Sequence, residues 1–460
     1  GKLKFDLLSY RYYDKGKWLD RIAKVVVAVV VVAFVVYGFW NGYYLLDHLI
    51  SSTFSGATDY WPIIAGWIKD YGPNIVYALL GIWVTTLIIC YIVVRVFGRL
   101  ASVFIYGIVI LQIVGFGFLY YYVQDWEYRW LFLIPIVIEV LILIFWRDKL
   151  QRAIRFTKIS TNIVGKVRGL IVPQIFQTIF MLFFGVLHFA ITAVTFLGIH
   201  ESSVTIGDYV ISNTDTWVYA LASVGFVIIG YMLIYVTLGI KMLMVHEYYR
   251  GGRPRILLGL KLVYKRWWQL LTYAFYSSII HAFQFIRKLI KGEIKIKNLL
   301  DAAEVTQELA PENPMALDKT KKVVKEEDGK VKVEKKKPPL LERAWFGLNY
   351  FTMPSMMIKD RKFFPALIES MRLYIKKLPD LYIKKSKVNV LFRFMQWASI
   401  FLSGVVGALA GVLGSNYFGW NIYLAVPTLA GVFYWIAGST AALVLNDLNM
   451  TYIEVMYLYT

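Results

Sequence analysis

Long apolar runs, separated by polar and basic segments, dominate the hydrophobic pattern of this chain. A helix needs about 20 predominantly apolar residues to cross the hydrocarbon core of a bilayer. The pattern predicts eight such spans, at about 24–43, 73–97, 102–123, 130–146, 170–199, 217–245, 395–413 and 422–445. We therefore predict an all-α fold, a polytopic integral membrane helix bundle.

Two further apolar pieces, 270–286 and 345–358, are short for a straight crossing. Polar residues such as Ser277 and His281 interrupt the first, and Pro354 lies in the second. Either both insert partly from one side or both cross. The predicted total is thus 8–10 transmembrane helices, and the even number places both termini on one side.

Basic segments set the predicted orientation, because cytoplasmic loops of membrane proteins are enriched in Lys and Arg. The leader 1–24 is basic, whereas the loop 201–216 contains acids and neither Lys nor Arg. Segment 147–168 is basic too, with apolar residues at helical spacing, so it is predicted to lie along the inner membrane surface. We expect cytoplasmic termini and a location in the cell membrane.

The same pattern divides the chain into five regions. They are a cytoplasmic leader (1–24), a first transmembrane part (25–286), a Lys-rich hydrophilic loop (287–344), a partial insertion with an amphipathic segment (345–394), and a second transmembrane part (395–460). Alternating Val around Lys-Glu-Glu-Asp-Gly-Lys at 325–330 indicates a β-hairpin. The loop is predicted to be cytoplasmic, but it would lie outside if both doubtful pieces cross.

Composition agrees with a membrane protein. The 460 residues are 58% hydrophobic and only 17% charged, and mean hydropathy is +0.56. The formal charge of +20 is spread between the apolar runs rather than gathered in one basic domain, so no nucleic-acid partner is expected. A single cysteine, Cys90, excludes an internal disulfide.

Glu139 is the acid placed centrally in a predicted span. Such residues are costly in lipid and are functional candidates, although a neutral Glu could also donate one interhelical hydrogen bond. In the predicted fifth span a polar stripe includes Gln174, Gln177 and His188. The stripe either lines a pathway or joins helices by hydrogen bonds.

Aromatic residues provide two candidate cation-binding faces. Tyr37, Trp40 and Tyr44 share a face beside Asn41, and Tyr231 and Tyr235 share another. The same pattern is also expected from an aromatic belt at the membrane interface, or by chance, because the chain is rich in aromatic residues.

Small residues recur at every fourth position in one predicted span, at Ser403, Gly407 and Gly411. This spacing allows helices to approach closely, mainly for packing, with a moving gate or a dimer seam as the alternatives. The Lys-rich runs 315–337 and 376–387 indicate solvated loops that could contact anionic lipid.

Enzyme motifs are missing from the sequence. It contains no nucleophile elbow, phosphate-binding glycine loop, paired catalytic carboxylates or zinc motif. We predict that the protein is not an enzyme, although membrane transferases can have sparse motifs, and we expect no catalytic residue, no metal and no cofactor.

Several segments resemble the choline transporter-like family of multi-span solute carriers. The resemblance rests on Tyr91-Ile-Val-Val-Arg-Val-Phe-Gly98, Trp146-Arg-Asp-Lys-Leu-Gln-Arg-Ala-Ile154 and the amphipathic stretch 364–378. Ala344-Trp-Phe-Gly-Leu-Asn-Tyr-Phe-Thr-Met-Pro354 and Ala366-Leu-Ile-Glu-Ser370 also resemble uncharacterised prokaryotic multi-pass proteins. The family's cysteines and long first external loop are missing. The resemblance implies a solute-carrier fold and transfers no binding residue.

From these features we predict a transporter or facilitator of a small cationic organic solute, such as choline or ethanolamine, that works by alternating access. Aromatic rings would hold the cation and Glu139 would balance its charge. The alternative is a non-transporting scaffold or accessory subunit that binds lipids or partner proteins through its basic cytoplasmic face. A third hypothesis is that the protein handles lipids. The predicted partners are the bilayer, the solute and anionic lipid at basic loops, and an oligomer is compatible with the sequence.

Overall fold

The computed structural model describes residues 61–123, 130–178, 203–206, 209–290, 321–327, 330–336 and 349–459, with single residues between 180 and 188 and at 345 and 347. The predicted first span lies outside the described residues, as do Tyr37, Trp40, Asn41 and Tyr44. Most of the predicted fifth span also lies outside them, apart from residues 170–178 and the single residues between 180 and 188.

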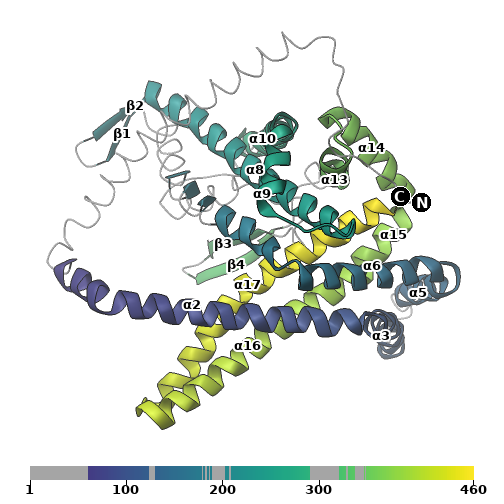
Figure 1. The fold of residues 1–460 in the computed structure, drawn as a ribbon, viewed down its shortest axis with the longest axis horizontal. Coiled ribbons are helices and arrows are strands. Elements are labelled where there is room, and N and C mark those ends of the chain that lie inside the picture. The colour runs from purple at the N-terminus through teal and green to yellow at the C-terminus, as the bar shows by residue number, and fades with distance from the viewer. Residues whose placement is uncertain are drawn as a thin grey trace.

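The described chain is predominantly helical (Figure 1). Its helices are α2 (Trp61–Arg99), α3 (Ala101–Tyr122), η2 (Trp130–Phe132), α5 (Leu133–Phe145), α6 (Arg147–Lys166), η3 (Arg168–Leu170), α8 (Asn213–Tyr249), α9 (Ile256–Lys265), α10 (Trp267–Ile290), α13 (Thr352–Ile358), α14 (Phe363–Lys376), α15 (Leu378–Ile383), the π-helical turn η4 (Lys384–Val388), α16 (Asn389–Phe418) and α17 (Ile422–Leu458). Two antiparallel hairpins join β1 (Ser203–Ile206) to β2 (Tyr209–Ser212), and β3 (Lys321–Glu327) to β4 (Lys330–Lys336). The predicted hairpin around 325–330 is therefore confirmed.

Within the described residues, five helices are long and apolar enough to cross a membrane. They are Tyr77–Arg99, Ala101–Tyr122, Val224–Tyr249, Leu378–Phe418 and Ile422–Leu458. Each overlaps a predicted span, which supports the assignment to membrane proteins. The sidedness of the termini and the identity of the membrane remain predictions.

Two predicted spans differ from the observed helices. The predicted span 73–97 is the C-terminal part of a longer helix, because α2 begins at Trp61 and continues unbroken to Arg99. The predicted span 130–146 contains the 3₁₀ turn η2 followed by the 13-residue α5, and together they are shorter than the roughly 20 residues that a crossing needs. The chain then bends by 82° into α6. Only together are the two bent segments, Trp130–Phe145 and Arg147–Lys166, long and apolar enough for a candidate span.

Helix α6 does not use its apolar face to contact lipid. Its residues Leu150, Ile154, Phe156 and Ile163 are buried inside the protein, where α6 packs against α2 and α17. Amphipathic spacing shows that one face of a helix is covered, but it does not show whether lipid or protein covers it. Protein therefore covers this face, and the placement of 147–168 along the inner membrane surface stays a prediction.

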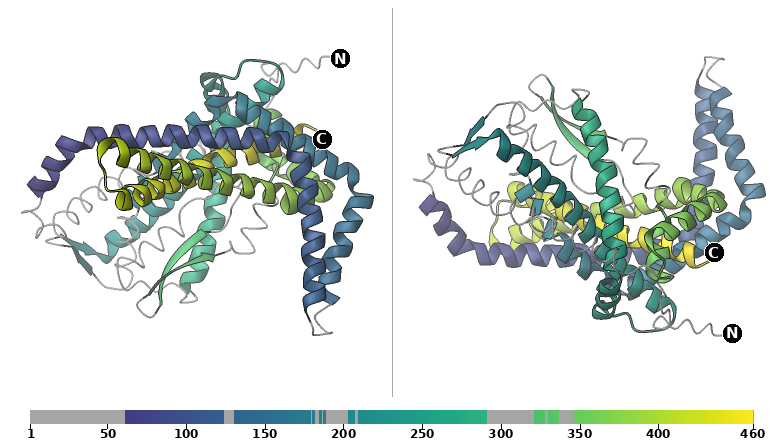
Figure 2. Two further views of the ribbon diagram at one scale, coloured as in Figure 1. Left: turned by 90° about the horizontal axis from the view of Figure 1, so that it is seen from below. Right: turned by 90° about the horizontal axis from the view of Figure 1, so that it is seen from above.

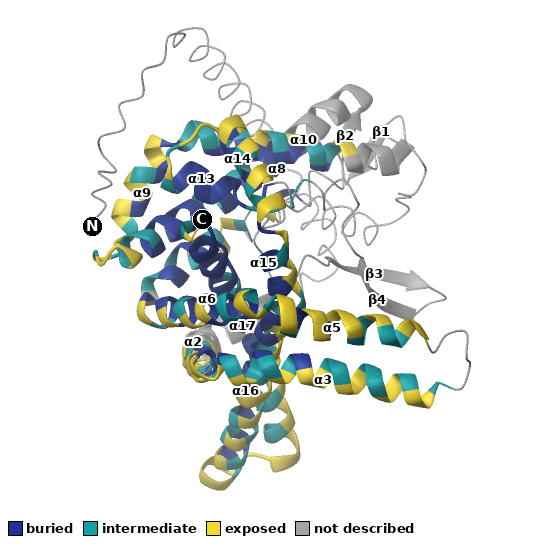
Figure 3. Cartoon of the chain, turned by 90° about the vertical axis from the view of Figure 1, so that its right-hand side faces the viewer, coloured by how far each residue is buried: buried dark blue, intermediate teal, exposed yellow. Residues whose placement is uncertain are grey.

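The C-terminal half of α17 is the centre of the core. Its residues from Asp447 to Tyr457 are all buried, and the helix packs against α2, α6, α8 and α16. By contrast, α3 with α5, and the tip of the α16–α17 hairpin, project from this core in different directions (Figures 2 and 3). These projecting pairs carry much of the exposed apolar surface, including Leu111 and Phe401. Their directions do not define one common membrane axis.

The two short apolar pieces, 270–286 and 345–358, belong to one continuous helix and one short buried helix. Residues 270–286 lie within α10, which packs against α8 and α14 and is not among the five candidate spans. Within 345–358 the regular helix is α13, whose seven residues are too few to cross a bilayer. Its residues 352–357 are buried beside α8 and α14, so protein surrounds this piece.

Candidate functional site

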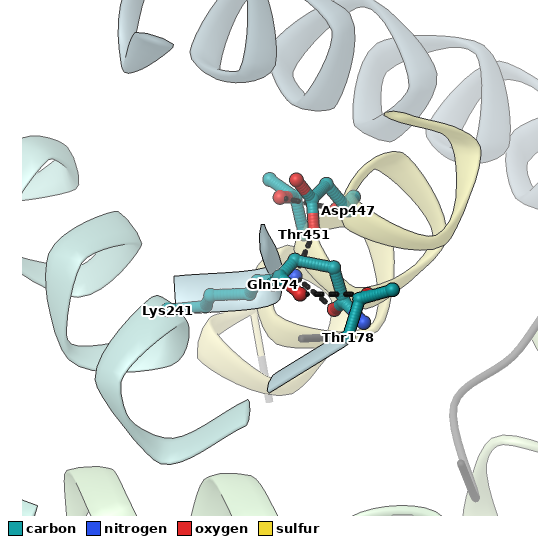
Figure 4. Close-up of polar contacts among 5 residues, drawn as sticks. All are labelled: Gln174, Thr178, Lys241, Asp447 and Thr451. Atoms are coloured by element: carbon teal, nitrogen blue, oxygen red, sulfur yellow. Dashed lines mark hydrogen bonds and ion pairs between the residues drawn. The ribbon is translucent and has the colours of Figure 1, made fainter. Parts of the chain in front are cut away.

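A lysine ammonium is buried between two candidate membrane spans. Lys241 lies on α8 with a side chain only 1% exposed, and its Nζ lies 2.5 Å from Oδ1 of Asp447 on α17. Nζ also donates to Oε1 of Gln174, in the helical segment 171–178, at 2.6 Å. Figure 4 shows the three side chains converging from separate elements. The arrangement gives the ammonium one carboxylate and one amide oxygen as acceptors.

Two nearby hydroxyls do not take part in this binding. Thr451 donates to the backbone oxygen of Asp447, and Thr178 donates to that of Gln174, each within its own helix. Burying two ions costs several kcal/mol per ion, which is offset only while they remain paired and hydrogen-bonded. The contact therefore ties α8 to α17 for as long as both charges are present.

A second lysine repeats this arrangement at another place in the fold. Lys387 lies in the π-helical turn η4 and is fully buried, and its Nζ lies 2.5 Å from Oε1 of Glu139 on α5. Nζ also donates to the side-chain oxygen of Gln112 on α3. Single π-helical turns within helices occur frequently at functional sites. Both lysines thus use the same acceptors, a carboxylate and a Gln amide oxygen.

Glu139 is therefore not a solitary acid. Its Oε1 is paired with Lys387, while its Oε2 is buried without a hydrogen-bond partner among the described residues. Helix α5 packs against α3 and α6, whereas α8 packs against α10, α13 and α17. No described contact joins Glu139 to the tyrosines of α8.

The predicted aromatic pair lies between α8 and α10. Tyr231 and Tyr235 are fully buried. The ring of Tyr235 stacks on Tyr273 with centroids 4.1 Å apart, and its hydroxyl lies 2.7 Å from Ser277 Oγ. Tyr231 meets His281 edge-on at 6.1 Å. One face of Tyr235 is therefore already covered by another ring.

The polar stripe of the predicted fifth span is divided between two environments. Gln174 binds Lys241, whereas His188 stacks on Phe226 of α8 with ring centroids 5.9 Å apart. Gln177 is half-buried. Gln174 and His188 therefore face protein, whereas Gln177 is partly exposed.

A third charged cluster surrounds Glu369 of α14. Lys359 donates to its carboxylate at 2.8 Å, Arg361 lies 3.4 Å away, and the hydroxyl of Ser355 also donates. Partial burial alone would raise the pKa of Glu369, but the hydrogen bonds from Lys359 and Ser355 and the nearby positive charges outweigh it and lower the pKa. This cluster fastens α14 to the end of α13.

Sequence reasoning missed Lys241, Lys387 and Asp447. Lys241 stands in the apolar run Ile240-Lys-Met-Leu-Met-Val245, and an ionisable residue in such a run is a signal by itself. Asp447 was missed because the last span was expected to end near 445, whereas α17 continues to Leu458. Glu454 was missed for the same reason, and both its carboxylate oxygens are buried without a hydrogen-bond partner among the described residues.

No family model matches this chain, and no curated protein matches it. The resemblance to the choline transporter-like family therefore remains a prediction.

Proposed function

We propose that this chain transports a small organic cation and that the cation competes with Lys241 for its acceptors. One observation carries the proposal, namely that Asp447 and Gln174 hold a primary ammonium between two candidate membrane spans. The repetition of the same acceptor set at Lys387 supports the idea that this chemistry matters to the protein.

The mechanism follows from the energetics of the buried pair. A solute ammonium that reached Asp447 would replace the lysine charge, and α8 would no longer be tied to α17. A ligand shifts a conformational equilibrium only through its different affinities for the two states. Here the difference would arise because the closed state already contains the competing ammonium of Lys241. Binding would therefore favour a state in which the two helices separate, as alternating access requires.

The acceptor set also favours one class of solute. Carboxylate and amide oxygens accept hydrogen bonds, and a primary ammonium, such as that of ethanolamine, has three N–H groups to donate. A quaternary ammonium, such as that of choline, has none and prefers aromatic faces. Since Tyr235 already stacks on Tyr273, we expect a primary amine to be preferred over choline at this site.

Flux into proteoliposomes tests the proposal. We expect uptake of labelled ethanolamine above that of empty vesicles, and weaker uptake of choline. The Lys241→Met/Asp447→Leu double variant should abolish this flux while it keeps the fold, because replacing a buried pair with apolar residues is often neutral for stability. Thr451→Val is the matched control and should retain flux, since its hydroxyl bonds only the backbone of its own helix. Absence of flux for both amines, or full flux in a folded double variant, would overturn the proposal.

A scaffold is the second candidate function, and the environment of Glu139 favours it. The carboxylate is buried and already neutralised by Lys387, as a permanent structural tie would require. If the protein has this function, variants of Lys241 and Asp447 should alter stability alone, and no amine should be transported. Co-purification of a membrane partner that is lost when 315–337 is deleted would support the scaffold.

A further inference from the structure

Helix α14 exposes an apolar stripe. Phe364, Ile368, Met371 and Ile375 follow one another at steps of three and four residues, which place them on one face of a helix. Ile368 is 60% exposed and Ile375 67% exposed. Packing among the residues that the structure describes does not account for this stripe.

The opposite face of α14 anchors the helix to the protein. Phe363, Ala366 and Ser370 are buried, and Ser370 Oγ accepts a hydrogen bond from the backbone N–H of Phe351 at 2.8 Å. The helix is therefore fixed in place while its apolar stripe stays exposed. Figure 3 shows exposed as well as buried residues along α14.

The stripe continues into a candidate membrane span. Beyond α14, Leu378 and Tyr382 keep the same steps and are exposed, and Phe394 and Trp397 are exposed on α16. Residues Leu378–Phe418 are apolar and long enough to cross a bilayer. The apolar stripe therefore leads directly toward a lipid-facing surface.

The charge and the length of α14 indicate that lipid covers its apolar stripe. Arg361, Lys362, Arg372 and Lys376 lie on or beside α14 and are exposed, whereas Glu369, its one acid, is largely buried and already paired. A second copy of the chain would bring the same positive charges together. With 14 residues α14 is about 21 Å long, too short to cross a bilayer but suited to lie in its surface.

We propose that α14 is an interfacial helix that lies in the plane of the membrane. Phe364, Ile368, Met371 and Ile375 enter the boundary between headgroups and acyl chains. The flanking Arg and Lys side chains contact the phosphates of anionic lipids, as basic amphipathic helices do. This inference does not depend on which solute, if any, the protein transports.

Spin labels measure the depth of the stripe directly. In a Cys90→Ser background, which removes the single cysteine, labels are placed at Ile368→Cys, Ile375→Cys and, as the polar control, Lys376→Cys. In phosphatidylcholine/phosphatidylglycerol vesicles we expect the two stripe labels to collide more with oxygen than with a water-soluble nickel chelate, and the control label to show the reverse. Equal access of the chelate to all three labels would overturn the proposal. So would spin–spin broadening at Ile368 that rises with the protein-to-lipid ratio, because a second copy would then cover the stripe.

The lipid charge is tested with the label at Ile368. We expect this label to lie deeper in vesicles that contain phosphatidylglycerol than in pure phosphatidylcholine. The Arg372→Gln/Lys376→Gln pair should remove that difference, whereas Arg155→Gln/Lys158→Gln on α6, which deletes the same charge elsewhere, should preserve it. A depth that does not respond to phosphatidylglycerol would overturn the assignment of anionic lipid.

Discussion

The ammonium of Lys387 lies 2.5 Å from a carboxylate oxygen of Glu139, although 248 positions separate the two residues. Neither charge reaches water, since the side chains are 0% and 7% exposed. The pair joins α5 to the π-helical turn before α16 and so connects the projecting α3–α5 helices to the C-terminal hairpin. Its strength depends on both partners being present, because a single buried charge is strongly destabilising.

Removing one member of this pair should therefore cost more than removing both. We expect Lys387→Met to lower the free energy of unfolding by about 3–5 kcal/mol, and Lys387→Met/Glu139→Leu to recover most of that loss. Thermal unfolding in detergent measures the effect, and Lys385→Met, at an exposed position of the same turn, is the control. Equal stability of the single and double variants would contradict the interpretation.

Close packing of α16 on α17 depends on glycine. A Cβ atom at Gly411 would lie 2.6 Å from Cα of Val426, whereas at Gly404 the nearest atom, the backbone oxygen of Ala430, is 4.0 Å away. Gly411→Ala should therefore destabilise the hairpin by about 1–3 kcal/mol, the usual cost of overpacking. Gly404→Ala should be neutral. Protease resistance of the two variants in detergent compares them, and similar resistance would show that the helices can separate without cost.

The turn after α13 places Asp360 in the left-handed region, with φ of 52°. Its Oδ1 lies 2.6 Å from Nε of Arg266. Asp360→Ala loses this ion pair and retains a strained backbone, while Asp360→Gly loses only the ion pair. We expect the glycine variant to be the more stable of the two, by roughly 1–2 kcal/mol. Chemical denaturation measures the difference, and a more stable alanine variant would refute it.

The cluster around Glu369 should make stability depend on pH. Because its pKa in the folded protein lies below the ordinary value of 4.5, the stabilising contribution of Glu369 is present above pH 4.5. The contribution is lost as the pH falls through the lowered folded-state pKa. Glu369→Gln should therefore be less stable than the parent chain at pH 7, and this gap should close in acid. Thermal midpoints of both proteins across this range test the prediction, which fails if the gap is the same at both ends.

Lys359 provides the complementary test at high pH. Burial alone would lower its pKa, but the hydrogen bond and charge of Glu369 outweigh burial and raise the pKa above 10.5. The contribution of Lys359 is therefore present below pH 10.5 and is lost as the pH rises through the raised value. Lys359→Met should be less stable than the parent at pH 7, and the two should converge only above the raised pKa.

The sequence determined the elements of this fold to the extent that they depend on local pattern. Apolar run length located α3 and α8, alternating Val located the β3–β4 hairpin, and the fourfold spacing of Ser403, Gly407 and Gly411 indicated the close approach to α17. These signals can be read because helix period, strand period and side-chain size act over a few neighbouring residues. The lengths of α2 and α17 were underestimated because a helix that enters protein can continue past the end of its apolar run.

Only the tertiary structure decided which charges meet. Glu139 was visible as a buried acid, but nothing in its neighbourhood pointed to Lys387, and Lys241 lies far in sequence from both Gln174 and Asp447. The same holds for α6, whose apolar face indicated burial without showing that α2 and α17, rather than lipid, cover it. An ion pair forms where packing brings two side chains together, and packing depends on the shapes of whole helices, which hydrophobic periodicity does not record.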